Sequence, residues 1–145
     1  MEIYTIGFAK KSAEAFFGAL RKAGIKRLID IRLNNTSQLA GFTKRDDLRF
    51  FLKEICGADY VHEPLLAPTP EILNLYKRKK ISWQEYEERF LELMGQRKIE
   101  EKIDQSLFNG PTMLLCSEAK ADRCHRRLVL EYLQRVGVNF QITHL

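Results

Sequence analysis

The chain has 145 residues, of which 45% are hydrophobic and 30% are charged, and its net charge is +5. This length and balance predict a folded, globular chain with one substantial core, and they exclude a disordered or fibrous protein. No apolar run reaches the roughly 20 residues that a membrane span needs, and the N-terminus has no signal-peptide pattern, so we expect a cytoplasmic protein with no membrane partner.

The first part of the chain predicts a strand, a helix and a second strand. The β-rich run at residues 2–8 is followed by Ser12, which can cap a helix, and by Gly24, which suits the end of that helix. Residues 27–32, RLIDIR, are apolar and β-branched, as expected of a strand that is covered on both faces. Together these segments predict a βαβ unit.

The next elements are a second helix and a third strand. The run from Thr43 to Asp46 resembles a capping box, and the helix is expected to continue to about Ile55. A short strand is predicted at residues 59–63, DYVHE.

A helical insert is predicted at about residues 70–108. Pro70 suits the first turn of a helix, and the run from Ser82 to Glu85 is a capping box for the next one. A third helical piece is expected from Arg97 to Leu107, where Asn109-Gly110-Pro111 ends it.

The chain closes with a strand at residues 112–116, a helix from about Asp122 to Val136, and a last strand in NFQITHL. The pattern predicts the α/β class, with a mostly parallel sheet of about five strands, helices on both faces, and the insert before the fourth strand. Residues 1–145 are expected to form a single α/β domain.

Most of the unusual polar residues follow predicted strands. In a parallel sheet these positions meet at the carboxyl edge, where ligands bind. The residues at this edge include Gly7 and Lys10, Asp30 and Arg32, Cys116 and Glu118, and the run from Arg123 to Arg127. Asp30 and Arg32 point to the same side of the strand, which fits an ion pair as well as a ligand-facing role for Arg32.

The last predicted helix places Cys124 and His125 near its N-terminus, which favours anions and thiolates. His125 leads the apolar stripe, so it is expected to point towards the sheet, whereas Arg127 aligns with Glu131 on a solvated face. Because Cys116 ends a strand and Cys124 opens a helix, we expect two separate candidate thiols and not one pair. Cys56 is expected to pack near a helix end, and three cysteines are too few for a disulfide framework.

A metal site is not expected. Cys124 and His125 project about 100° apart on a helix, and the chain has no C-x-x-C or H-x-x-x-H spacing. No cofactor is expected either.

Basic residues leave a nucleic-acid partner open, although net charge alone does not establish one. The densest basic run, residues 77–80, lies where a helix is expected to end, and cations stabilise that position. Tyr4, Tyr60 and Trp83 are too widely spread along the chain to indicate a base-stacking platform.

The combination YTIG, IDIR, SQLAGF, YVHEP, LLCSE and CHRRL resembles the domain-of-unknown-function family 488, from Ile3 to Leu145. The resemblance implies a compact bacterial or archaeal α/β domain. Its motif positions here are Gly7, Asp30, Arg32, Cys116, Glu118, Cys124, His125 and Arg126. Many members read TIGHS where this chain has Phe8-Ala9 after Gly7, so a histidine role in that loop is absent.

A second, local likeness is to rhodaneses, in which a strand-end cysteine precedes an arginine-bearing loop. The element Asp30-Ile31-Arg32 is similar to their acidic-x-Arg strand end, but the loop after Cys116 lacks glycine.

The sequence therefore predicts a pocket for a small anion, phosphate-like or sulfur-bearing, at the strand carboxyl ends. It is compatible with a thiol-dependent enzyme, whose candidate catalytic residues are Cys116 and Cys124. The candidate ligand-binding residues are Gly7, Lys10, Asp30, Arg32, Glu118, His125 and Arg126. One alternative is a basic nucleic-acid-binding module without catalysis, and another is an interaction module whose partner surface is the helical insert.

Overall fold

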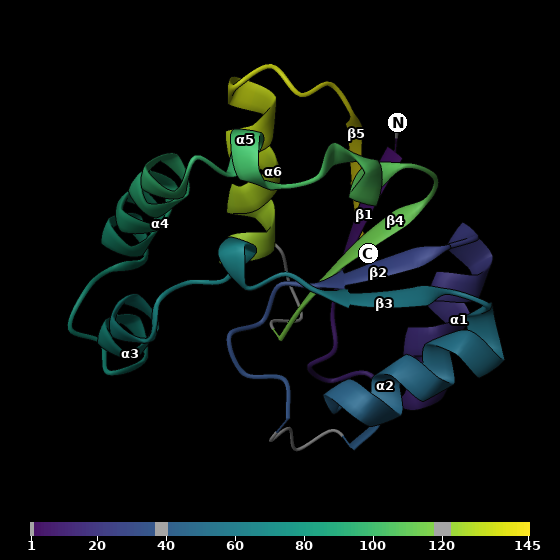
Figure 1. Ribbon diagram of the computed structural model, residues 1–145. Helices are drawn as coiled ribbons and strands as arrows, with labels where there is room; N and C mark the ends of the chain where they lie inside the picture. The colour runs from purple at the N-terminus through teal and green to yellow at the C-terminus, as the bar shows by residue number, and fades with distance from the viewer. Residues whose placement is uncertain (1, 37–40, 118–122) are drawn as a thin grey trace.

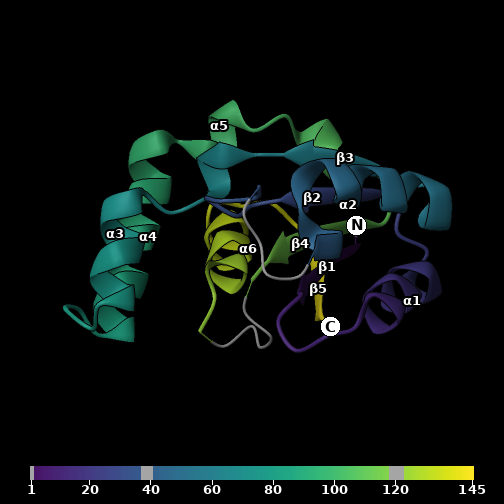
Figure 2. The ribbon, with the colours of Figure 1, turned by 90° about the horizontal axis from the view of Figure 1, so that it is seen from below.

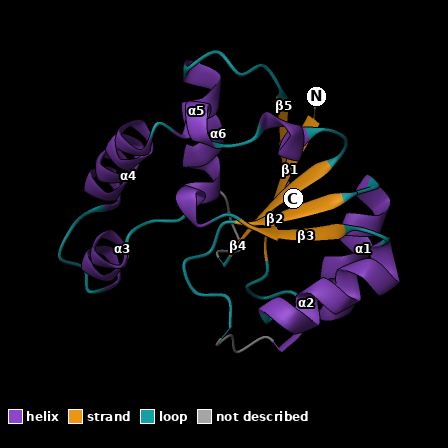
Figure 3. Ribbon diagram, viewed as in Figure 1, coloured by secondary structure: helices purple, strands orange, loops and turns teal. Residues whose placement is uncertain are grey.

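One parallel sheet organises the chain. The computed structural model describes residues 2–36, 41–117 and 123–145, and among them five parallel strands pair in the order β3-β2-β4-β1-β5 (Figure 3). The strands are β1 (Glu2–Gly7), β2 (Arg27–Asp30), β3 (Asp59–His62), β4 (Thr112–Cys116) and β5 (Gln141–His144). The predicted α/β class, with about five parallel strands, is confirmed.

Helices cover both faces of this sheet (Figures 1 and 2). One face carries α1 (Ala13–Ala23) and α2 (Arg45–Phe51), and the other carries α6 (His125–Arg135). The helical insert contains α3 (Pro70–Lys77), α4 (Trp83–Arg97) and α5 (Ile99–Lys102). Figures 1 and 2 place α3 and α4 on the far side of α6 from the sheet. Within the described residues, no helix is both long and apolar enough to cross a membrane.

The central strand β4 divides the core into two clusters. Successive side chains of a strand point to opposite faces, so Met113 and Leu115 pack with α1 and α2, while Leu114 and Cys116 pack with α4 and α6. All five β4 residues are buried. Cys116 therefore ends the strand on the side of the helical insert.

The predicted helix caps are largely confirmed. The Ser12 hydroxyl accepts a hydrogen bond from the Ala15 amide at 3.1 Å, and Gly24 ends α1 in the left-handed conformation with φ of 67°. Ser82 caps α4 in the same way, through the Glu85 amide at 3.1 Å. These caps define the start of α4 beside the cavity described below.

Three predicted boundaries are wrong. The Thr43 side chain does not cap α2: a 3-10 turn, η1 (Gly41–Thr43), precedes it, Lys44 is the N-cap, and α2 passes into the wider turn η2 (Leu52–Cys56). The third piece of the insert is not one helix, because Ile103 has an extended backbone between α5 and η4 (Gln105–Phe108). The β2 strand ends at Asp30, two residues early.

The last helix also starts later than predicted. Cys124 is its N-cap and has an extended backbone, so α6 begins at His125. Asp122, the predicted cap, lies outside the described residues. The predicted pairing of Arg127 with Glu131 is confirmed at 2.9 Å. The prediction that this face of α6 is solvated is wrong, because Arg127 is partly buried and also contacts Glu87 of α4 at 3.3 Å, which ties the insert to α6.

Candidate functional site

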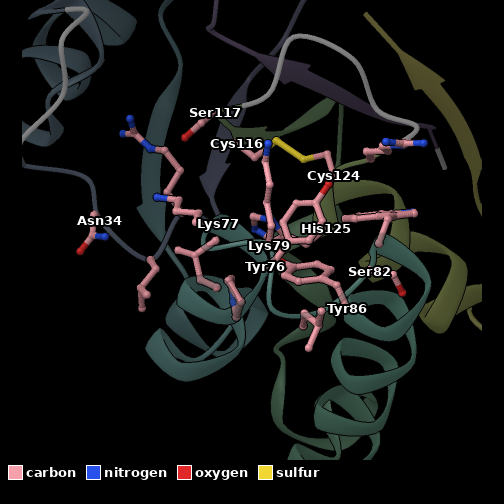
Figure 4. Close-up of a pocket in the computed structure, with 17 residues that line it drawn as sticks. Asn34, Tyr76, Lys77, Lys79, Ser82, Tyr86, Cys116, Ser117, Cys124 and His125 are labelled. Carbon is pink, nitrogen blue, oxygen red and sulfur yellow. A yellow bond between two sulfur atoms is a disulfide. The ribbon is translucent and has the colours of Figure 1, made fainter.

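A cavity of about 670 Å³ lies between the carboxyl ends of β2 and β4 and the helical insert (Figure 4). One wall comes from the loop after β2, a second from the end of β4 and the start of α6, and a third from α3 and α4. The cavity therefore lies at the edge of the sheet where parallel strands collect ligands.

Arg32 is held rigidly in the first wall. Its Nε and Nη2 donate to the two carboxylate oxygens of Asp30, each at 2.8 Å, and Nη2 also donates to the Thr43 carbonyl at 2.7 Å. The residue is only 2% exposed, yet Nη1 has no hydrogen-bond partner among the described residues. An unsatisfied buried donor costs about 1–3 kcal/mol, so a ligand acceptor that reached this nitrogen would remove that cost.

Asp30 supports Arg32 and does not line the cavity. The Tyr60 hydroxyl donates to Asp30 Oδ2 at 2.6 Å, and Asp30 is fully buried. Burial, followed by the hydrogen bond to Asp30, raises the pKa of Tyr60. The predicted ion pair between Asp30 and Arg32 is confirmed.

Cys116 and Cys124 form a disulfide in the second wall. The expectation of two separate thiols is therefore wrong, because Cys124, the N-cap of α6, lies beside Cys116 at the end of β4 in the folded chain. Both residues are at least 98% buried, and Figure 4 shows the sulfur–sulfur bond at the cavity. Behind it, Arg126 Nη1 donates to Cys116 Sγ at 3.5 Å.

Cys56 is the free cysteine of the described residues and is half-buried. Its thiol lies 3.9 Å from the Phe17 carbonyl, and burial raises its pKa. These contacts agree with the predicted packing role.

His125 occupies the start of α6 and points towards the sheet, as predicted. Its Nε2 lies 2.7 Å from the Ile31 carbonyl, which accepts, so Nε2 carries the proton and Nδ1 is unprotonated in the neutral ring. Burial lowers the pKa of His125 to about 4, with a further contribution from the Arg126 charge. At neutral pH the ring is therefore an uncharged member of the cavity wall.

Three further cations line the cavity. Lys77 and Lys79 come from the end of α3, and Arg123 precedes α6. The predicted position of the basic run at a helix end is confirmed, since α3 ends at Lys77. Lys77 and Lys79 of this run also line the cavity at the strand ends. The sequence around them does not predict that position.

The predicted site residues divide into four groups. Arg32, Cys116, Cys124 and His125 line the cavity, whereas Asp30 and Arg126 are buried behind Arg32 and Cys116. Gly7 and Lys10, at and just after the end of β1, are not lining residues. Glu118 lies outside the described residues.

The third wall was missed by reasoning from the sequence. Tyr76, Trp83 and Tyr86 line the cavity from α3 and α4. Their spacing of seven and three residues would place them near one another if α3 and α4 formed an antiparallel pair, but the connection between the helices does not specify that arrangement.

Metal-ligand geometry gives no candidate site within the described residues. None of their His, Cys, Asp and Glu side chains form a group of three or more that could hold a metal ion.

Comparison with known proteins identifies one family. Its model, described as "Domain of unknown function DUF488", matches residues 12–133. No curated protein and no solved structure matches the chain.

Proposed function

The chain belongs to the DUF488 family, and we propose that its strand-end cavity binds a small anionic ligand, phosphate-like or sulfur-bearing. The observation that carries this proposal is the charge of the lining. Arg32, Lys77, Lys79 and Arg123 line the cavity, and no carboxylate is found among the described lining residues. An anion in this cavity gains attraction from several fixed cations.

Arg32 supports the proposal through its geometry. The Asp30 carboxylate accepts from Nε and Nη2, and this pairing holds the guanidinium in one orientation with Nη1 unpaired. Ligand binding therefore does not have to cost the conformational entropy of ordering this side chain. The cations from the insert are exposed, and they contribute attraction at longer range than the buried guanidinium.

We further propose that the cysteine pair is the reactive group of this cavity. Two electrons and two protons, supplied by a dithiol reductant, convert the disulfide into two thiols. The Arg126 guanidinium, 3.5 Å from Cys116 Sγ, stabilises a thiolate on that sulfur. In the reduced protein, Cys116 is then the nucleophile that faces the bound anion.

Calorimetric titration with inorganic phosphate at low ionic strength tests the anion proposal. The double variant Lys79→Gln/Arg123→Gln removes two exposed cations of the cavity. Two such charges contribute about 1.4 kcal/mol together, so we expect about tenfold weaker binding. The matched control, Lys22→Gln/Lys26→Gln, removes the same charge near the opposite edge of the sheet and should bind as the wild type does. Equal weakening in both variants would show that only net charge attracts phosphate.

Alkylation tests the reactive-group proposal. After dithiothreitol treatment, iodoacetamide should modify Cys116 or Cys124 faster than Cys56, and saturating phosphate should slow that reaction because the ligand covers the cavity. Mass spectrometry of peptides locates the adduct, and Cys56 is the internal control. The proposal fails if neither cavity cysteine reacts after reduction and the Cys116→Ser and Cys124→Ser variants bind phosphate normally.

A further inference from the structure

Three aromatic side chains form a continuous cluster in the insert wall. The ring centroids of Trp83 and Tyr86 lie 5.0 Å apart in a stacked arrangement, and Tyr76 lies 5.5 Å from Trp83 and 5.2 Å from Tyr86. All three residues line the cavity. Tyr86 is buried, whereas Tyr76 and Trp83 are half-buried, so their rings offer apolar surface to a ligand.

The cavity therefore combines two kinds of surface. Figure 4 shows Tyr76 and Tyr86 on the insert side, and Cys116, Cys124 and His125 on the side of the sheet. Arg32 and Arg123 belong to the latter side, at the end of β2 and the start of α6. Phosphate alone would use the cations and leave the aromatic wall unused.

An unpaired, buried nitrogen of Arg32 supports the polar side of the cavity as a preorganised binding surface. Arg32 is 98% buried, lines the cavity, and has Nη1 without a hydrogen-bond partner among the described residues. The N-terminus of the 11-residue α6 lies at the same cavity, through Cys124 and His125, and the positive end of its dipole favours an anion there. A guanidinium nitrogen and the positive end of a helix dipole together form a suitable environment for phosphate oxygens.

We infer that the ligand is a nucleoside phosphate, with its base on the Tyr76 and Trp83 rings and its phosphate beside Arg32 and Arg123. This inference rests on the proposed anion-binding function and names its ligand class. Stacking on aromatic rings suits any base because every base has a π face. The cavity, at about 670 Å³, is within the usual range for a small-molecule site, which favours a single nucleotide over a long strand.

The experiment uses Trp83, the single tryptophan of the chain. The full-length protein is titrated with adenosine 5′-monophosphate, adenosine, ribose 5-phosphate and inorganic phosphate, with calorimetry for affinity and tryptophan fluorescence for location. We expect the nucleotide to change the fluorescence and to bind at least tenfold more tightly than each of the other three compounds.

A matched pair of variants separates stacking from charge. Tyr76→Leu removes a cavity ring and should weaken nucleotide binding about tenfold while inorganic phosphate binds unchanged. Phe50→Leu removes an exposed ring from α2, outside the cavity, and should change neither affinity. Circular dichroism verifies that both variants fold.

The other possible results would contradict either the nucleoside inference alone or the anion proposal as well. If phosphate and the nucleotide bind equally, the nucleoside inference fails and the anion proposal stands. If neither binds, both fail. If a twenty-nucleotide single-stranded RNA binds much more tightly than the mononucleotide, with strong salt dependence, the site belongs to a nucleic-acid-binding surface and the single-nucleotide inference is wrong.

Discussion

At the scale of single residues, His125 connects the start of α6 to the loop after β2. Its Nε2 proton is donated to the Ile31 carbonyl, and its ring lies 5.5 Å from that of Phe90 in α4. The residue therefore joins the sheet, α6 and the insert in the wall of the cavity. A protonated ring would place a second cation beside Arg126, in surroundings that favour the neutral form.

This arrangement predicts a pH-dependent stability. The pKa of His125 is about 4 in the folded protein, compared with the ordinary histidine value of 6.5 in the unfolded chain. Between these values the unfolded chain binds more protons, so stability decreases as the pH falls through this window. At about 1.4 kcal/mol per pH unit, lowering the pH from 7 to 5 should cost about 2 kcal/mol through this group.

Urea unfolding of the wild type and His125→Gln at both pH values measures this effect. Glutamine can donate to the same carbonyl and does not titrate, so the variant should lose about 2 kcal/mol less than the wild type does between pH 7 and pH 5. Identical losses in the two proteins would show that His125 does not produce the pH dependence.

At the scale of elements, the position of α4 depends on hydrogen bonds from Arg97 as well as on the packing of its apolar face. Arg97, in the last turn of α4, donates through Nη1 to the carbonyls of Leu65 and Ala67, each at 2.7 Å. These carbonyls belong to the segment around η3 (Pro64–Leu66), which links β3 to the insert. Burial lowers the pKa of Arg97. A partly buried guanidinium thus fixes the end of α4 to the connection that leaves the sheet.

The contacts of Arg97 predict that replacing it lowers the free energy of unfolding more than replacing Arg89 of the same helix does. Arg97→Met should lower the free energy of unfolding by about 1.5–3 kcal/mol, since hydrogen bonds to charged groups contribute that much. Arg89→Met is the matched control, because among the described residues Arg89 makes only an exposed pair with Glu85 at 3.5 Å. This substitution should cost less than about 0.5 kcal/mol. Urea unfolding measures both values, and similar losses would contradict the assigned role of Arg97.

At the scale of the whole molecule, the insert and the sheet share one core. Tyr86, Phe90 and Met94 of α4 pack in the same cluster as Leu128 of α6 and Leu114 of β4. The cavity lies at the end of this shared core, so its aromatic wall and its strand-end wall are held by the same packing. The helical insert therefore supplies part of the candidate site as well as part of the core.

The sequence by itself determined the elements and the edge of the sheet at which to look. The strand patterns, the Ser12 and Ser82 caps and the position of Cys116 at the end of a strand depend on neighbours a few residues away, and local periodicity reports them. The helix starts that failed, predicted at Thr43 and at about Asp122, are places where caps alone do not fix a helix start.

Only the tertiary structure decided which of these segments meet. It placed β4 between β1 and β2, joined Cys116 to Cys124, and set Tyr76 and Trp83 across the cavity from the strand ends. These relations depend on strand pairing, on where the start of α6 lies relative to β4, and on helix packing. A periodic pattern states which face of an element is buried, but it does not state which other element buries it.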